Sequence, residues 1–340
     1  QFISRVGHSE SDVVEIVINA LVLIATEHSR ESVWSVAQLF SSQNEVRRKA
    51  GQQVLTRTTA NLNERGRKKE SQAFGNSRVL FQDLIKHAQF QTNEKTCRLK
   101  FTRNIEFKDY VVPNRETLTV TLHPHRPEAS SSHDRSPGEF DHDPFPKSFN
   151  RILSFKEEAT VMHSKAKPKK ITLETTAGET VNYLCKQEKN GDLRKDARLM
   201  EFNAVINRML QRDVSGRHRR LRLRTYSVVC LNEECGLLEW VPHTTALRTL
   251  IADAYNAYPP IENPRFASAN VRERFCAIQQ ERSGQQQMAL RYDREIVTQF
   301  TPCFHRWFLT EFVEPTAWFE ARTMYTRSVA TWSAVGHVVG

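Results

Sequence analysis

One amphipathic helix, set between segments that favour strands, constrains the fold of this chain more than any other feature. Strand-like segments cover residues 169–174 and 181–186 before the helix, and residues 221–231 and 237–241 after it. Between positions 198 and 212, apolar residues recur at the 3.6-residue spacing of a helix face: Leu199, Phe202, Val205, Ile206, Met209 and Leu210. Residues 176–179, Thr-Ala-Gly-Glu, predict a tight turn between the first two strands. This order of elements predicts an α+β fold.

The first 110 residues favour helices alone. Apolar residues recur at helical spacing in four segments, which cover residues 13–24, 33–40, 46–54 and 79–88. Short polar stretches join them, which predicts an antiparallel helical array. The first segment is apolar around most of its surface, so we expect neighbouring helices to bury it.

Composition excludes several classes of protein. The 340 residues include 12 Gly and 13 Pro, too few for a collagen-like chain, and 19 Phe and 5 Trp can fill a core. The longest apolar run, Ile16 to Ala25, is interrupted by Asn19 and is shorter than the ~20 residues that cross a bilayer, so no membrane association is expected. The six cysteines form no Cys-x-x-Cys pair, which indicates reduced thiols.

A lysine followed by acids suggests chemistry on phosphates. Lys186 ends the second predicted strand, and Asp192 and Asp196 stand where the long helix begins. Phosphoryl transfer depends on holding phosphates and neutralising their charge. A strand-end ammonium that a nearby carboxylate orients could do this.

Several motifs, taken in order, resemble those of the phosphatidylinositol-3-kinase-related protein kinases. The segments 198–203 (Arg-Leu-Met-Glu-Phe-Asn) and 232–241 (Asn-Glu-Glu-Cys-Gly-Leu-Leu-Glu-Trp-Val) most resemble the ATR-type DNA-damage checkpoint kinases. Further matching segments are Lys167–Ile171, Leu184–Lys186, Asp192–Ala197, Arg224–Tyr226, Phe304–Leu309, Pro315–Trp318 and Tyr325–Ala330. Residues 1–110 are similar in character to the end of the helical-repeat FAT region that precedes these kinases.

The resemblance implies a domain organisation. Residues 1–110 would be the helical segment at the end of the FAT region. Residues 111–245 would be the PI3K-like kinase small lobe (N-lobe), with a Pro- and Ser-rich loop over residues 111–150 before it. Residues 246–340 would be the start of a helical large lobe (C-lobe), truncated before its catalytic loop. The implied cofactors are ATP and Mg²⁺.

On the phosphate side of the implied site, Lys186 would contact the α- and β-phosphates. The turn that contains Ser164 would cover them. The family has an acidic residue just before the Asp-Leu-Arg segment, where this chain has Gly191 after a loop about two residues longer. The acid that orients Lys186 is therefore open among Asp192, Asp196 and Glu201.

On the adenine side, the resemblance assigns five residues. Asp196 and Tyr226 would line the pocket behind the base. Glu239 and Val241 would offer a backbone carbonyl and amide to its edge, and Trp240 would stack on its face. A hinge between strand and helix suits this role, because its peptide groups can pair with a base and an aromatic wall excludes water.

The sequence predicts no catalytic or metal-binding residue. It contains no Asp-Arg-His or Asp-Phe-Gly motif, so we expect the general base and metal ligands to lie beyond Gly340. We therefore expect the chain by itself to have no measurable kinase activity. We also expect its large-lobe segment to leave apolar faces uncovered at Trp307, Phe308, Trp318, Phe319 and Trp332.

The resemblance implies a serine/threonine protein kinase in the nuclear DNA-damage checkpoint and repair response. Its substrates would carry Ser or Thr before Gln, and its partners would include a dedicated ATR-interacting regulatory subunit and, indirectly, single-stranded DNA. Three alternatives stay open. They are a lipid (phosphoinositide) kinase of the same superfamily, a noncatalytic helical scaffold, and a nucleic-acid-binding module. In a nucleic-acid-binding module, the net charge of +10 and the arginines between positions 217 and 224 would attract the phosphate backbone.

Overall fold

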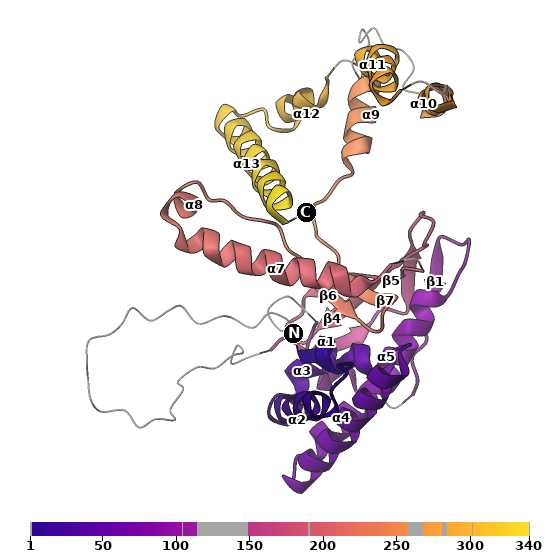
Figure 1. Cartoon of the computed structure of the whole chain (residues 1–340), viewed down its shortest axis with the longest axis vertical. Coiled ribbons are helices and arrows are strands. Elements are labelled where there is room, and N and C mark those ends of the chain that lie inside the picture. The colour runs from indigo at the N-terminus through magenta and orange to yellow at the C-terminus, as the bar shows by residue number, and fades with distance from the viewer. Residues whose placement is uncertain are drawn as a thin grey trace, which may run out of the picture. The chain divides into compact units, whose positions relative to one another are not determined.

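A computed structural model describes residues 2–103, 105–113, 149–189, 191–257, 268–280, 284–300 and 302–339 (Figure 1). The predicted loop of residues 111–150 lies largely outside these residues. The chain divides into two compact units, residues 1–219 with 223–241, and residues 220–222 with 242–340. The predicted domain boundaries near residues 110 and 245 remain predictions.

Helices make up the first unit as far as Gln89, as predicted, but the expectation of helices alone to residue 110 is wrong, because Thr96–Arg98 forms a strand. Trp34 and Phe81 pack with ring centroids 5.2 Å apart, and Phe40 packs on both Phe74 and Phe81. The helices are α1 (Phe2–Arg5), α2 (Ser11–Glu27), α3 (Ser29–Phe40), α4 (Glu45–Glu64) and α5 (Lys68–Gln89). A Cβ on Gly51 of α4 would lie 2.7 Å from the carbonyl of Leu39, so only glycine permits the close approach of α3.

The expectation that the first long helix is buried on most sides is wrong. Val17, Ile18 and Leu21 of α2 are buried, but Ile16 and Leu23 are exposed. The covered side of α2 is the one that meets α1, α3 and α4. The exposed apolar residues lie on the opposite side, where no other described helix packs.

Seven strands among the described residues form one antiparallel sheet in the order β1-β3-β4-β5-β7-β6, with β2 paired to β4. The strands are β1 (Thr96–Arg98), β2 (Ile152–Phe155), β3 (Glu158–Val161), β4 (Lys169–Thr175), β5 (Thr180–Gln187), β6 (Val228–Cys230) and β7 (Cys235–Glu239). The β4–β5 hairpin forms where the sequence predicts it, and Gly178 at its turn has a φ of +81°, which glycine adopts without strain.

The helix α5 covers one face of this sheet. Residues that alternate along β4 and β5 point toward it: the Cys185 thiol donates to the Leu84 carbonyl (3.4 Å), and the Lys169 ammonium donates to the Phe90 carbonyl. On the same face the Tyr183 hydroxyl donates to the Pro113 carbonyl at 2.8 Å. Because side chains alternate along a strand, Lys170, Leu184 and Lys186 point to the other face.

The predicted long strand over residues 221–231 is wrong, since only Val228–Cys230 pairs in the sheet. An asparagine takes the place of a partner strand. The Asn207 side chain donates to the Leu223 carbonyl at 2.9 Å and accepts from the Leu223 N–H at 2.7 Å. This amide satisfies the backbone of residue 223 without a ladder.

The predicted amphipathic helix is α7 (Leu193–Arg212), followed by the short α8 (Val214–His218). Its buried residues include Met200, Asn203 and Asn207, whereas Phe202 and Met209 of the apolar stripe are exposed. The stripe is therefore not the side that faces the sheet. The inner side of α7 carries the amides of Asn203 and Asn207, and the Asn207 amide binds the backbone of residue 223.

The second unit is helical. Its elements are α9 (Leu247–Ala257), α10 (Ser268–Gln280), α11 (Gln285–Glu295), a 3₁₀ turn (Val297–Gln299), α12 (Phe304–Glu311) and α13 (Pro315–Val339). Tyr325 of α13 packs on Phe304 and Phe308 of α12, with centroids 5.3 and 5.6 Å apart. Of the helices described here, none combines the length and hydropathy that crossing a membrane requires.

Candidate functional site

The sheet face opposite α5 carries Lys186 and Trp240 together. Lys186 of β5 pairs with Gly236 of β7, and Leu184 pairs with Leu238 in the same register. Trp240 continues β7 by donating its N–H to the Asn182 carbonyl (2.9 Å), about 13 Å beyond Gly236 at roughly 3.3 Å per residue. The two side chains thus stand on one face, on neighbouring strands.

The acid that contacts Lys186 is none of the three that the motif resemblance leaves open. The Lys186 ammonium lies 3.0 Å from the Glu188 carboxylate, and the two side chains are 20% and 44% exposed. Asp192 instead caps α7 and holds Arg194 at 2.7 Å. The sequence does contain a signal for this pair, because Glu188 stands two residues after Lys186, in the loop that is about two residues longer than in the family.

Tyr226 lies within electrostatic reach of both Asp196 and Lys186. Burial raises the pKa of Tyr226, the Asp196 carboxylate raises it further, and the Lys186 ammonium opposes both. Asp196 stands on the first turn of α7, and Tyr226 precedes β6. The first turn of α7 and the end of β5 therefore both act electrostatically on the residue that precedes β6.

The end of β7 is tied into the sheet. Glu239 donates its N–H to the Ser227 carbonyl and accepts the Ser227 N–H on its carboxylate, both at 2.8 Å. The Lys170 ammonium lies 4.6 Å from the centroid of the Trp240 ring, a cation–π contact. Val241 is half-buried and is the last residue of the first unit before the chain passes to the second.

Ser164 lies in the turn between β3 and β4. Its N–H donates to the Met162 carbonyl (2.9 Å), and its own carbonyl accepts from the Lys167 N–H (3.0 Å). The side chain is exposed. As for metals, the described part of the chain holds no group of three His, Cys, Asp or Glu residues that could bind one.

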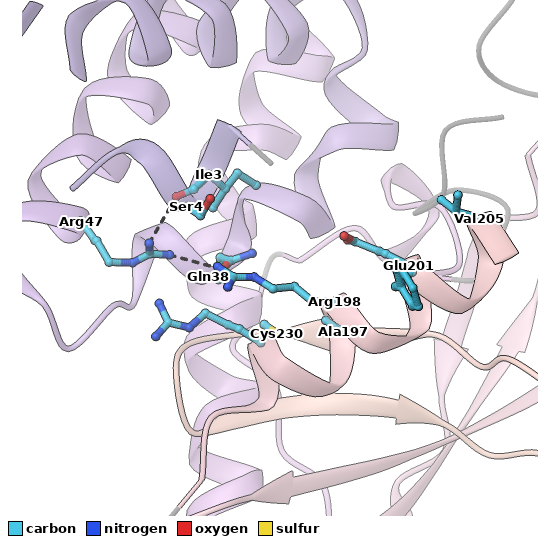
Figure 2. Close-up of a pocket in the computed structure, with 11 residues that line it drawn as sticks. Ile3, Ser4, Gln38, Arg47, Ala197, Arg198, Glu201, Val205 and Cys230 are labelled. Atoms are coloured by element: carbon cyan, nitrogen blue, oxygen red, sulfur yellow. Dashed lines mark hydrogen bonds between the residues drawn. The ribbon is translucent and has the colours of Figure 1, made fainter. Parts of the chain in front are cut away.

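A separate pocket lies between the helical segment and α7 (Figure 2). It has a volume of about 490 Å³ and is lined by none of the seven predicted site residues. Arg47 on its wall donates to the Ile3 carbonyl (3.2 Å) and to the Gln38 side chain (3.3 Å). Burial lowers the pKa of Arg47, and the nearby charge of Arg194 lowers it further.

Glu233, in the turn between β6 and β7, joins the helical segment to the start of α7. Its carboxylate accepts from the Ser42 hydroxyl (2.6 Å) and the Gln43 N–H (3.0 Å). It also lies 3.5 Å from Arg47 and 3.8 Å from Arg194. Burial by itself would raise the pKa of Glu233, but these hydrogen bonds and the charge of Arg194 leave it lowered. Local patterns in the sequence cannot reveal a contact across some 190 residues.

Two protein families match different parts of the chain. Residues 181–340 match phosphatidylinositol 3- and 4-kinase, and residues 1–80 match the HEAT repeats of serine/threonine-protein kinase ATR-like proteins. The whole chain aligns with serine/threonine-protein kinase ATR of Arabidopsis thaliana at 32% identity and with protein kinase rad3 of Schizosaccharomyces pombe at 30%. It spans only 12% and 14% of their lengths.

Solved structures support the fold. The open conformation of CtTel1 matches the whole chain with a TM-score of 0.73 at 20% identity, over 12% of that protein. The FAT and kinase domain of CtTel1 matches with a TM-score of 0.72, over 22% of that chain. These findings confirm the resemblance that the motifs indicate, to the phosphatidylinositol-3-kinase-related protein kinases and, among them, to the ATR-type kinases.

Proposed function

We propose that the face bearing Lys186 and Trp240 binds the ATP of a serine/threonine protein kinase. The observation that carries this proposal is the placement of an ammonium and an indole on one sheet face, about 13 Å apart along the strands. A base can stack at the indole while its phosphates extend to the ammonium. The spacing of Lys186 and Trp240 thus suits a nucleoside triphosphate.

On the adenine side, Trp240 stacks against the base, and Glu239 and Val241 offer backbone groups to its edge. Asp196 and Tyr226 line the pocket behind it, consistent with their position beside Lys186. Lys170 rests on the Trp240 ring and has to move if the base takes that face. A cation–π contact at an exposed site is worth about 0.5–1 kcal/mol, so the displacement costs little.

On the phosphate side, Lys186 holds the α- and β-phosphates, and the turn with Ser164 covers them. Mg²⁺ supplies charge neutralisation at the phosphates when it is bound in such kinases. The described residues hold no group of three His, Cys, Asp or Glu side chains that could form a metal centre by themselves. We therefore assign to this chain the holding of the nucleotide, and no step of phosphoryl transfer.

We further propose that the longer protein phosphorylates protein substrates at Ser or Thr before Gln and acts in the nucleus. Its partners would be an ATR-interacting regulatory subunit and, through it, single-stranded DNA. The relatives' names, which are those of serine/threonine-protein kinases, support a protein substrate over a lipid. They also favour a kinase over a helical scaffold or a nucleic-acid-binding module.

Nucleotide-dependent stabilisation tests the proposal. A ligand that binds only the folded state raises the melting temperature, and at a fixed ligand concentration the increase is larger for tighter binding. MgATP should raise the melting temperature of the chain, and Trp240→Ala or Lys186→Ala should abolish most of the increase. Lys195→Ala, an exposed lysine on α7, is the matched control and should leave it unchanged. Equal stabilisation of all four proteins would refute the assignment of this face.

A further inference from the structure

We propose that Glu188 positions the Lys186 ammonium for the nucleotide phosphates, and that residue 191 is a glycine because Glu188 occupies the space of its side chain. The inference rests on the proposed function. It assigns the orienting carboxylate to the turn after β5, outside the helix α7.

The backbone of this turn is held in place. Glu188 directly follows β5, and its N–H donates to the Glu234 carbonyl at 2.8 Å. The Gly191 N–H then donates back to the Glu188 carbonyl at 3.3 Å. Both hydrogen bonds fix the position of the Glu188 backbone. The Glu188 carboxylate therefore extends from a fixed point of the chain and accepts a hydrogen bond from the Lys186 ammonium at 3.0 Å.

The Glu188 side chain occupies the space that a side chain at position 191 would need. A Cβ on residue 191 would lie 2.5 Å from Cγ of Glu188, and 3.6 Å from its Cδ. Carbon atoms do not approach so closely, so a side chain at position 191 would displace the Glu188 side chain. With the Glu188 side chain where it lies in this structure, the turn has no room for a side chain at residue 191.

The other acids near this turn have different partners. Asp192 binds Arg194 through both carboxylate oxygens, at 2.8 and 2.7 Å. The Glu234 carboxylate accepts from the Gln187 side chain at 2.9 Å. Glu201 lines the separate pocket. Glu188 is therefore the acid in direct contact with the Lys186 ammonium.

A carboxylate on the ammonium restricts the rotamers of a long side chain and keeps its charge directed to one place. Because Glu188 is partly exposed, solvent weakens the pair. We therefore expect Glu188→Gln to weaken ATP binding about two- to fivefold, in the range of exposed ion pairs. Adenosine lacks phosphates, so its affinity should not change.

The test compares ATP and adenosine affinities, by calorimetry, for the chain and its variants. Glu188→Gln should weaken ATP alone. Gly191→Ala should do the same, because its methyl group displaces Glu188. Adding Gly191→Glu to Glu188→Ala should restore ATP affinity relative to Glu188→Ala, because it returns a carboxylate to the turn. Glu234→Gln, the matched acid that contacts Gln187, should change neither affinity.

The outcomes separate this inference from the proposed function. If ATP binds the unmodified chain and Lys186→Ala weakens it, but Glu188→Gln and Gly191→Ala do not, the positioning role is overturned while the nucleotide site stands. Equal weakening of ATP and adenosine by Glu188→Gln would also overturn it, since that result indicates a structural role. If ATP binding does not depend on Lys186 and Trp240, the proposed function itself fails.

Discussion

The Ser42 hydroxyl donates a 2.6 Å hydrogen bond to the Glu233 carboxylate, although 191 positions of sequence separate the two residues. Ser42 follows α3 in the helical segment, and Glu233 lies in the turn between β6 and β7. Since the same carboxylate lies 3.8 Å from Arg194 on α7, it links the helical segment to the helix beside Lys186. A displacement of the helical segment would therefore act directly on the start of α7.

Replacement of Glu233 by glutamine should destabilise the first unit at neutral pH by about 1.5–3 kcal/mol, the range for hydrogen bonds to a charged group. The folded-state pKa of Glu233 is lowered from 4.5, so its contribution is fully present above the unfolded pKa. It is lost as the pH falls through the lowered folded-state value.

Urea unfolding of the unmodified chain and of Glu233→Gln, from pH 7 to pH 3, measures this contribution. The difference in unfolding free energy should shrink toward zero below about pH 4.5. Glu234→Gln controls for the loss of a neighbouring charge. A difference that stays constant across this range would show that the ionised form of Glu233 contributes nothing.

Trp34 links the helical segment to the chain that leads to the sheet. Its side chain is 1% exposed, and its indole N–H donates to the Val111 carbonyl at 2.8 Å. Trp34→Phe keeps an aromatic ring beside Phe81 but leaves that carbonyl without its donor. The expected cost is about 1–3 kcal/mol of unfolding free energy. Chemical denaturation checks this, and an unchanged midpoint would contradict it.

The second unit should bind dyes that recognise apolar surface. Phe319 and Met324 of α13 are 62% and 71% exposed, so this helix presents apolar side chains to solvent. The fluorescence of anilinonaphthalene sulfonate should rise when it is mixed with the folded chain. Phe319→Ser with Met324→Ser should reduce that signal, whereas Phe308→Leu, at a buried position, should not.

Periodicity predicted the elements whose partners lie nearby in sequence. The β4–β5 hairpin is an example, since alternation and a turn glycine suffice to define it. Periodicity wrongly predicted a strand over residues 221–227, where the side chain of Asn207, and not a neighbouring strand, makes the hydrogen bonds to the backbone of residue 223. The motif resemblance predicted Lys186 and Trp240 as nucleotide contacts, and this stays a prediction. It could not identify Glu188, because the turn that carries this acid departs from the family pattern.

Two asparagines on the inner side of α7 should respond in opposite ways to the same substitution. Both are buried, but the Asn207 amide makes two hydrogen bonds to residue 223, whereas the Asn203 amide has no partner among the described residues. Asn207→Leu should cost about 1–3 kcal/mol for each backbone group that it leaves unpaired. Asn203→Leu has a similar volume and removes an amide that is desolvated without compensation, so it should be neutral or stabilising. Thermal unfolding of the two variants checks this difference, and an equal loss of stability in both would show that the Asn207 contacts with residue 223 do not stabilise the unit.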